Sequence, residues 1–134
     1  MEFVVRKHNK SEFYETFSKW LDLHHFNRIN ELILPELVFV AYDSDDYPIY
    51  CIWFYFTSSN GLAWIAFPAS NKNIAYKKRQ YGLDYLIKYV CNYAKKKGIL
   101  TLITTSGTDS VIESLVKNEF EVGDTNISHF VRKL

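Results

Sequence analysis

The chain has 134 residues, of which 48% are apolar and 17% aromatic, and its formal net charge is +1 at pH 7. This length and apolar content predict one compact domain over residues 1–134 and exclude a disordered or low-complexity protein. The small net charge gives no overall basic signal, so we expect no nucleic-acid partner unless a local patch supplies one.

The sequence shows no sign of a membrane or secretory segment. No apolar run approaches about 18 residues, and the N-terminal residues do not form the apolar core of a signal peptide. Cys51 and Cys91 stand apart without CxxC or Cys/His spacing, which indicates buried thiols rather than a zinc site or a disulfide framework. We therefore expect a cytoplasmic protein with neither a metal nor a membrane partner.

The N-terminal third predicts a strand, a helix and a short second helix. Residues 3–6 have the composition of a strand, and Ser11 is a candidate N-cap for a helix that ends near His25. Apolar residues recur in this helix at the spacing that builds one face for a sheet: Phe13, Phe17, Trp20 and Leu21. Between residues 26 and 36, similar spacing before Pro35 indicates a short helix or a turn.

Three β-rich runs predict a meander in the middle of the chain. They span residues 37–42, 48–57 and 62–67, and turn residues separate them at 43–46 and 58–61. All three runs are apolar on both faces, so helices are expected to cover both sides of the sheet.

A long amphipathic helix follows, from about residue 78 to residue 97. Its apolar stripe comprises Leu83, Leu86, Ile87, Val90 and Ala94, and Gly98 follows as the C-terminal cap. The polar, basic insert at residues 69–78 is expected to form a flap before it.

The C-terminal part predicts a strand, a helix and two further strands. The strand covers residues 99–104, and Thr108 or Asp109 caps the helix. The last strands are expected at 120–122 and 127–132. The predicted fold class is α/β (α+β): a single mixed, mostly antiparallel sheet of six to seven strands with helices on both faces.

The stretch from residue 62 to residue 83 has the pattern of a phosphate-binding turn. An apolar strand leads through a basic linker to Gly82 at the expected start of a helix. The first N–H groups of a helix have no internal partner, so an anion can bind there. The alternative is a glycine that only serves the backbone geometry.

The element order and residues 62–122 resemble the GNAT family of acyl-CoA-dependent N-acyltransferases. Arg79-x-x-Gly82 is similar to that family's pyrophosphate turn, Gln/Arg-x-x-Gly-x-Gly/Ala, and Lys117 and Phe120 match two positions of its later Leu-Tyr-x-Lys-x-Gly-Phe segment. The resemblance implies acetyl-CoA as cofactor, with the pantetheine paired to strand backbone and the pyrophosphate on helix amides. The cofactor-binding residues that it implies are Ile65, Phe67, Arg79, Gln80, Tyr81, Gly82 and Leu83.

Three departures from the family pattern concern the chemistry. Asp84 replaces a small residue, and its carboxylate would repel a pyrophosphate unless it points away. Leu115 stands where many members have a tyrosine that protonates the departing thiolate, and leucine has no proton to donate. The strand at 62–67 has no carboxylate to act as a general base. The catalytic residues are therefore unassigned.

Other polar and aromatic groups have both a structural and a functional interpretation. Capping, packing or solvation is favoured over catalysis for His24, His25, His129, Asp43, Asp45 and Asp46. The basic residues Lys72, Lys77, Lys78 and Arg79 could bind a cofactor phosphate or a nucleic-acid backbone. The alternative is that they are simply solvated. Tyr81 begins a ladder of four tyrosines spaced four apart, which pack on neighbouring loops or form a homodimer surface through Tyr85, Tyr89 and Tyr93.

Two functions from different classes follow from this sequence. The first is an acyl-CoA-dependent N-acyltransferase in which an amine acceptor attacks the thioester directly. The alternative is a catalytically inactive GNAT-fold protein that binds or assembles with a partner through its aromatic surface.

Overall fold

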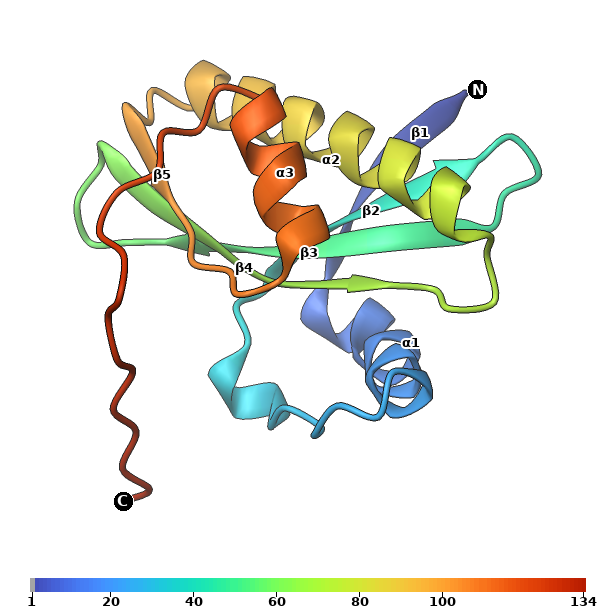
Figure 1. Ribbon diagram of the computed structural model, residues 1–134, viewed down its shortest axis with the longest axis horizontal. Helices are drawn as coiled ribbons and strands as arrows, with labels where there is room; N and C mark the ends of the chain where they lie inside the picture. The colour runs from blue at the N-terminus through green and yellow to red at the C-terminus, as the bar shows by residue number, and fades with distance from the viewer. Residues whose placement is uncertain (1) are drawn as a thin grey trace.

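The computed structural model describes residues 2–134, and its helices and strands follow the expected order through the second long helix and the strand after it. The elements are β1 (Phe3–Asn9), α1 (Lys10–Leu23), the 3₁₀ turn η1 (Glu31–Ile33), β2 (Leu37–Asp43), β3 (Pro48–Phe56), β4 (Leu62–Ser70), α2 (Tyr76–Lys96), β5 (Thr101–Ile103) and α3 (Asp109–Lys117). Figure 1 shows α1 on one face of the sheet and α2 with α3 on the other.

The sheet runs in the order β1-β2-β3-β4-β5. Its first three pairings are antiparallel, whereas β4 and β5 are parallel because α2 crosses over between them. The expected mixed, mostly antiparallel sheet with helices on both faces is therefore confirmed. The expected number of six to seven strands is wrong, since five strands pair within residues 2–134.

The missing strands are those expected at residues 120–122 and 127–132. Both segments lie outside regular structure, and every residue from 121 onward is exposed. Strand-forming composition sets a local preference only, whereas a strand also needs a neighbouring edge with which to exchange hydrogen bonds. Beyond β5, this segment projects away from the sheet instead of lying along it (Figure 1).

Each face of the sheet carries its own apolar core. On the α1 side, Phe17 packs edge-on against Trp53, with ring centroids 5.1 Å apart. On the α2 side, the predicted helix stripe is confirmed: its five members, Leu83, Leu86, Ile87, Val90 and Ala94, are all buried. Gly98 ends this helix with a φ of 81°, as a C-terminal cap requires.

One N-terminal prediction, the capping residue of the first helix, needs correction. Asn9, not Ser11, caps α1: the Asn9 side chain accepts from the N–H of Glu12, and the Glu12 carboxylate accepts from the N–H of Asn9. The Ser11 hydroxyl donates to the Asn9 side chain instead, because the helix begins one residue before it. The short helix or turn expected between residues 26 and 36 is confirmed as the three-residue turn η1.

The connection from β4 to α2 is much shorter than the flap expected at residues 69–78. β4 continues to Ser70 and α2 begins at Tyr76, which leaves residues 71–75 as the connection. A β-bulge lets the strand continue past Pro68, because two β4 residues there face one residue of β3. Asn71 anchors the turn by donating to the Pro48 carbonyl at 3.1 Å.

Among residues 2–134, no helix combines the length and the hydrophobicity that a bilayer-spanning segment requires.

Candidate functional site

The sheet opens where β4 and β5 separate. The two strands pair only over Leu62–Trp64 and Thr101–Ile103, after which residues 104–108 leave β4 and lead into α3. Within the described chain, the edge of β4 from Ile65 to Ser70 therefore has no strand partner on that side. Unpaired backbone groups on such an edge are free to bind a ligand that offers matching donors and acceptors.

Phe67 holds an unusual backbone conformation beside this opening. Its φ is 50°, in the left-handed region that large side chains rarely adopt. The strain coincides with the bulge in β4, between the pairs Trp53–Ala66 and Cys51–Ala69. Strained residues and bulges concentrate at functional sites, so the position of this one favours a site at the opening.

A crevice lies behind the opening, between β4, α2 and α3. Its volume is about 10 Å³, and it is lined by Ile52, Ile65, Ala66, Pro68, Leu83, Ile87, Thr104, Val111 and Leu115. This space is at the lower limit for a single water molecule, so the crevice is closed in this structure. Leu115, at the position of the family's tyrosine, is one of the side chains that close it.

A polar cluster joins the two helical layers at the end of β4. The His24 Nε2 atom lies 3.0 Å from the carbonyl oxygen of Ser70 and 3.1 Å from its hydroxyl. Arg79 reaches the same hydroxyl from the other face of the sheet, donating through Nη1 at 3.0 Å. Because the carbonyl can only accept, the tautomer with a proton on Nε2 satisfies the histidine contact.

The guanidinium of Arg79 lacks a counter-ion in the part of the chain that the structure describes. The ion pairs among residues 2–134 do not include it, and its Nε is buried without a hydrogen-bond partner. The ring of Tyr76 lies 5.6 Å from the guanidinium. The phenol of Tyr50 lies near the same charge, yet burial dominates and raises the pKa of Tyr50 to about 12. An uncompensated, partly buried cation is costly unless an anion joins it.

The N-terminus of α2 adds positive potential beside Arg79. The N–H groups of Tyr76, Lys77 and Lys78 have no carbonyl one turn earlier within the helix, and the N-cap residue Ala75 makes no side-chain capping hydrogen bond. The helix is 21 residues long, so its dipole is fully developed at this end. Arg79 and these amides together form a site suited to a dense anion.

Gly82 lies inside α2 rather than at its entrance. The helix begins six residues earlier, so the amides of Gln80, Tyr81, Gly82 and Leu83 fall where helical N–H groups donate to carbonyls one turn back. A Cβ on Gly82 would lie 2.9 Å from Cγ2 of Ile49 on β3. The glycine therefore allows α2 to approach the sheet closely, and the predicted phosphate turn at these four amides is not formed.

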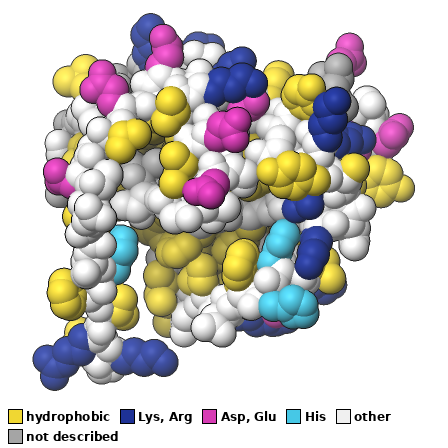
Figure 2. All heavy atoms as spheres, viewed as in Figure 1, with side chains coloured by type: hydrophobic (Ala, Val, Ile, Leu, Met, Phe, Trp, Pro, Cys, Tyr) yellow, Lys and Arg dark blue, Asp and Glu magenta, His cyan; other side chains and the backbone are white. Residues whose placement is uncertain are grey.

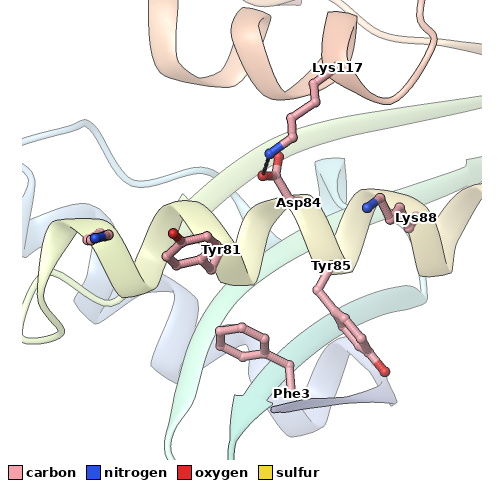
Figure 3. Close-up of a pocket in the computed structure, with 7 residues that line it drawn as sticks. Phe3, Tyr81, Asp84, Tyr85, Lys88 and Lys117 are labelled. Carbon is pink, nitrogen blue, oxygen red and sulfur yellow. Dashed lines mark hydrogen bonds and ion pairs between the residues drawn. The ribbon is translucent and has the colours of Figure 1, made fainter. Parts of the chain in front are cut away.

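Asp84 points away from this site, toward α3 (Figure 3). Its Oδ2 accepts from the ammonium of Lys117 at 2.9 Å, and its side chain is largely buried. The same view shows an open hollow lined also by Phe3, Tyr81, Tyr85, Lys77 and Lys88. The Asp84 charge is thus neutralised between two helices and does not oppose an anion at the start of α2.

The remaining candidate residues take structural or solvent-exposed positions. Asp43 is buried and binds Lys78 at 2.7 Å, so this lysine is not available to a ligand, while His25 and His129 are exposed. Three members of the tyrosine ladder are exposed: Tyr81, Tyr85 and Tyr89. Tyr93 instead packs on Phe39, with ring centroids 4.9 Å apart.

Sequence reasoning missed three members of the site: Ser70, Tyr50 and Tyr76. The first two are opposite each other on β4 and β3, a pairing that no local pattern announces. Tyr76 could have been found from its three-residue spacing to Arg79 on one helix, had the helix start been placed correctly.

No protein-family model and no curated protein matches this sequence. Solved structures do match its fold. An acetyltransferase of the GNAT family from Streptococcus pneumoniae is 13% identical with a TM-score of 0.68, covering 98% of this chain and 100% of its own. A Mycobacterium tuberculosis protein solved in complex with CoA is 14% identical with a TM-score of 0.67, covering 93% of this chain and 76% of its own.

A third neighbour is the N-acetylglutamate synthase from Neisseria gonorrhoeae, solved with coenzyme A and N-acetyl-glutamate. It is 14% identical with a TM-score of 0.63, and the match covers 88% of this chain but 28% of the synthase. At this level of identity the likeness defines the architecture alone. The chain therefore has the GNAT fold, as the sequence resemblance predicted.

Proposed function

We propose that the chain is an acyl-CoA-dependent N-acyltransferase whose cofactor binds at the opening between β4 and β5. The observation that carries the proposal is Arg79: a partly buried guanidinium with an unpartnered Nε, next to the amide end of α2. A pyrophosphate offers the charge and the acceptor oxygens that this group lacks. The CoA bound to two structural neighbours supports the same cofactor class.

The proposed phosphate contacts come from the first turn of α2, and Arg79 is the one member of the sequence motif among them. The proposed donors are Arg79 and the N–H groups of Tyr76, Lys77 and Lys78. The exposed Lys72 lies in the connection before α2, where its ammonium donates to the carbonyl of Leu23 at 3.3 Å. Gln80, Tyr81 and Leu83 remain predicted cofactor-binding residues through their side chains, and Gly82 remains one only through a change at the start of α2. The pantetheine arm would pair with the free backbone edge of β4 at Ile65 and Phe67.

The arm can enter only if α3 moves. The crevice of about 10 Å³ is closed by side chains of α2 and α3, and the Asp84–Lys117 pair ties those helices together. Once the thioester lies on the β4 edge, a backbone N–H near the bulge polarises its carbonyl and a neutral amine attacks the carbonyl carbon. The C–N bond forms as the C–S bond breaks, CoA leaves as a thiolate, and the proton lost by the amine passes to that thiolate directly or through solvent water. Such a site accelerates the reaction by positioning and electrostatics, which do not require a dedicated acid at Leu115.

Titration calorimetry with CoA and acetyl-CoA tests the proposal, using Arg79→Gln and the matched control Arg28→Gln. Arg28 is exposed and pairs with Asp22. Removing one charge-assisted contact costs about 1.5–3 kcal/mol, so we expect the dissociation constant for CoA to rise about 10- to 150-fold in Arg79→Gln. The control is expected to bind like the wild type.

Two results would contradict the proposal. One is a wild-type protein that binds neither ligand at millimolar concentration, and the other is an unchanged affinity in Arg79→Gln. The first result would favour the inactive binding module, which the closed crevice and the exposed faces of Tyr85 and Tyr89 support independently. In that function the aromatic face of α2 contacts a partner or a second copy, with Tyr93 as a packed support.

A further inference from the structure

Three aromatic side chains lie together on the α1 face of the sheet, beside the unpaired part of β4. Tyr55 on β3 shares the face of Trp53, which packs on α1, because residues two apart in a strand point the same way. Trp64 on β4 pairs directly opposite Tyr55 and is therefore on this face too. The ring centroid of Phe67 lies 6.5 Å from that of Tyr55. Tyr55, Trp64 and Phe67 are called the aromatic wall below.

The chain itself covers the aromatic wall only in part. Trp64 is 37% exposed and Phe67 is 36% exposed. The η1 turn holds the wall in place, because the Tyr55 hydroxyl donates to the carbonyl of Ile33 at 2.9 Å. Figure 2 shows hydrophobic side chains gathered between β4 and the η1 segment, and in this view of the described residues no charged side chain lies among them. Such a fixed, uncharged aromatic surface suits a flat aromatic group of a ligand.

The backbone of Phe67 gives a second, independent indication of a ligand. Its φ of 50° is a conformation that glycine adopts at no steric cost and that a phenylalanine adopts only under strain. The strained residue places an aromatic ring on the wall where a small residue would fit the backbone better. Strain of this kind concentrates at sites that bind ligands.

The wall lies on the side from which an acceptor has to approach the proposed thioester. The side chain of Ile65 points into the α2-side core and lines the crevice that the cofactor arm would enter. The α1 face of β4 is then left for the attacking amine, which would pass along Trp64 and Phe67. Contact with an apolar surface disfavours the ammonium form of an amine, so the wall itself promotes the neutral nucleophile.

We infer that the acceptor is a primary amine that carries an aromatic ring and no anionic group. The inference rests on the proposed acyl transfer and adds the substrate class. The ring lies on Trp64 and Phe67, and the nitrogen lies at the β4 edge. The C–N bond forms on that nitrogen as the C–S bond of the thioester breaks, and the nitrogen's proton passes to the thiolate. A polyamine is disfavoured, because its further charges would be desolvated against the wall.

Acetyl transfer to three amines tests the inference, with release of the CoA thiol as the measurement. The acceptors are 2-phenylethylamine, 2-cyclohexylethylamine, which has the same chain with a ring that is not flat, and spermidine. We expect kcat/KM for 2-phenylethylamine to exceed that for each of the others at least about 3-fold. Trp64→Ala is expected to lower kcat/KM for 2-phenylethylamine about 10-fold, mainly through KM, and to leave the affinity for CoA unchanged.

Phe56→Ala is the matched control. Phe56 is on the same strand as Tyr55 but on the opposite face, where it packs on Phe54 and is 56% exposed. It is expected to leave both the preference among amines and the affinity for CoA unchanged. Phe67→Gly is the second test variant: glycine takes the native φ without strain, so the fold is retained while the wall loses a ring.

A binding measurement separates this inference from the proposed function. The indole N–H resonance of Trp64, identified by its loss in Trp64→Ala, is expected to shift when 2-phenylethylamine is added without CoA, and Phe67→Gly is expected to weaken that binding. A protein that shows this shift but binds no CoA contradicts the acyltransferase and retains the wall as an aromatic-amine site. A protein that binds CoA but prefers spermidine or 2-cyclohexylethylamine overturns the inference and leaves the acyltransferase standing. An unchanged indole resonance, or an unchanged kcat/KM in Trp64→Ala, also overturns it.

Discussion

Gly82→Leu is expected to lower the free energy of unfolding by about 3 kcal/mol or more. Even a Cβ at this position meets Cγ2 of Ile49 at 2.9 Å, and Phe3 lies on the same side at 3.6 Å. The contacted methyl group belongs to a β-branched side chain on a central strand, which has little freedom to move aside. A leucine can therefore be accommodated only if α2 shifts away from β3.

Urea denaturation measures this loss, with Asn92→Leu as a control on the exposed side of the same helix. The control gains helix propensity and is expected to be neutral or slightly stabilising. Gly82→Ala combined with Ile49→Ala provides a second check, because the double variant should be more stable than the sum of the single changes predicts. Strict additivity, or a stable Gly82→Leu protein, would show that α2 does not depend on this close approach.

Asp43→Ala is expected to cost about 3 kcal/mol at pH 7. Asp43 is 5% exposed, and its carboxylate binds the ammonium of Lys78 at 2.7 Å and the N–H groups of Asp45 and Tyr47 at 3.0 and 2.9 Å. Its removal opens the β2–β3 turn and leaves Lys78 without its counter-ion. The neighbouring Asp45→Ala, on an exposed side chain, is expected to change stability by no more than about 0.5 kcal/mol.

The Asp43 contribution should also depend on pH. Burial acts to raise the pKa of Asp43, but the hydrogen bonds from Lys78 and the two N–H groups outweigh it and hold the pKa below its ordinary value of 3.8. A carboxyl with a lowered native pKa stabilises the fold above its unfolded pKa, and this stabilisation is lost as the pH falls through the native value. Unfolding curves at pH 7 and near pH 3 should therefore show a shrinking difference between wild type and Asp43→Ala. A difference independent of pH would exclude the carboxylate charge as its source.

The same ion pair bears on the proposed cofactor site. Lys78 is the third residue of α2, and its N–H is one of the proposed phosphate donors, while its side chain is committed to Asp43. The pair anchors the start of the helix to the β2–β3 turn, so Asp43→Ala should also weaken CoA binding if the helix end is the phosphate site. Arg79→Gln separates the two effects, because it leaves this anchor in place.

Local sequence patterns were sufficient to predict the elements whose signals extend over a few residues. The apolar stripe of α2 and the turns at 43–46 and 58–61 act over a few residues, and the structure retains all of them. The topology resembling the GNAT family was also visible, because the order of strands and helices is carried by such local patterns. Arg79 was selected from its motif position, and the structure gives it a distinct environment.

Features that depend on partners far apart in the sequence became apparent in the folded chain alone. Gly82 gives the appearance of a helix entrance in the sequence, but Ile49, a residue of β3, determines its role. The bulge at Phe67 carries β4 past Pro68, where local composition predicted an end. Ser70 joins His24 and Arg79 only because the two helical layers meet at the end of that strand. Residues 121–134 have the composition of strands but no partner, since a strand forms only where another edge accepts its hydrogen bonds.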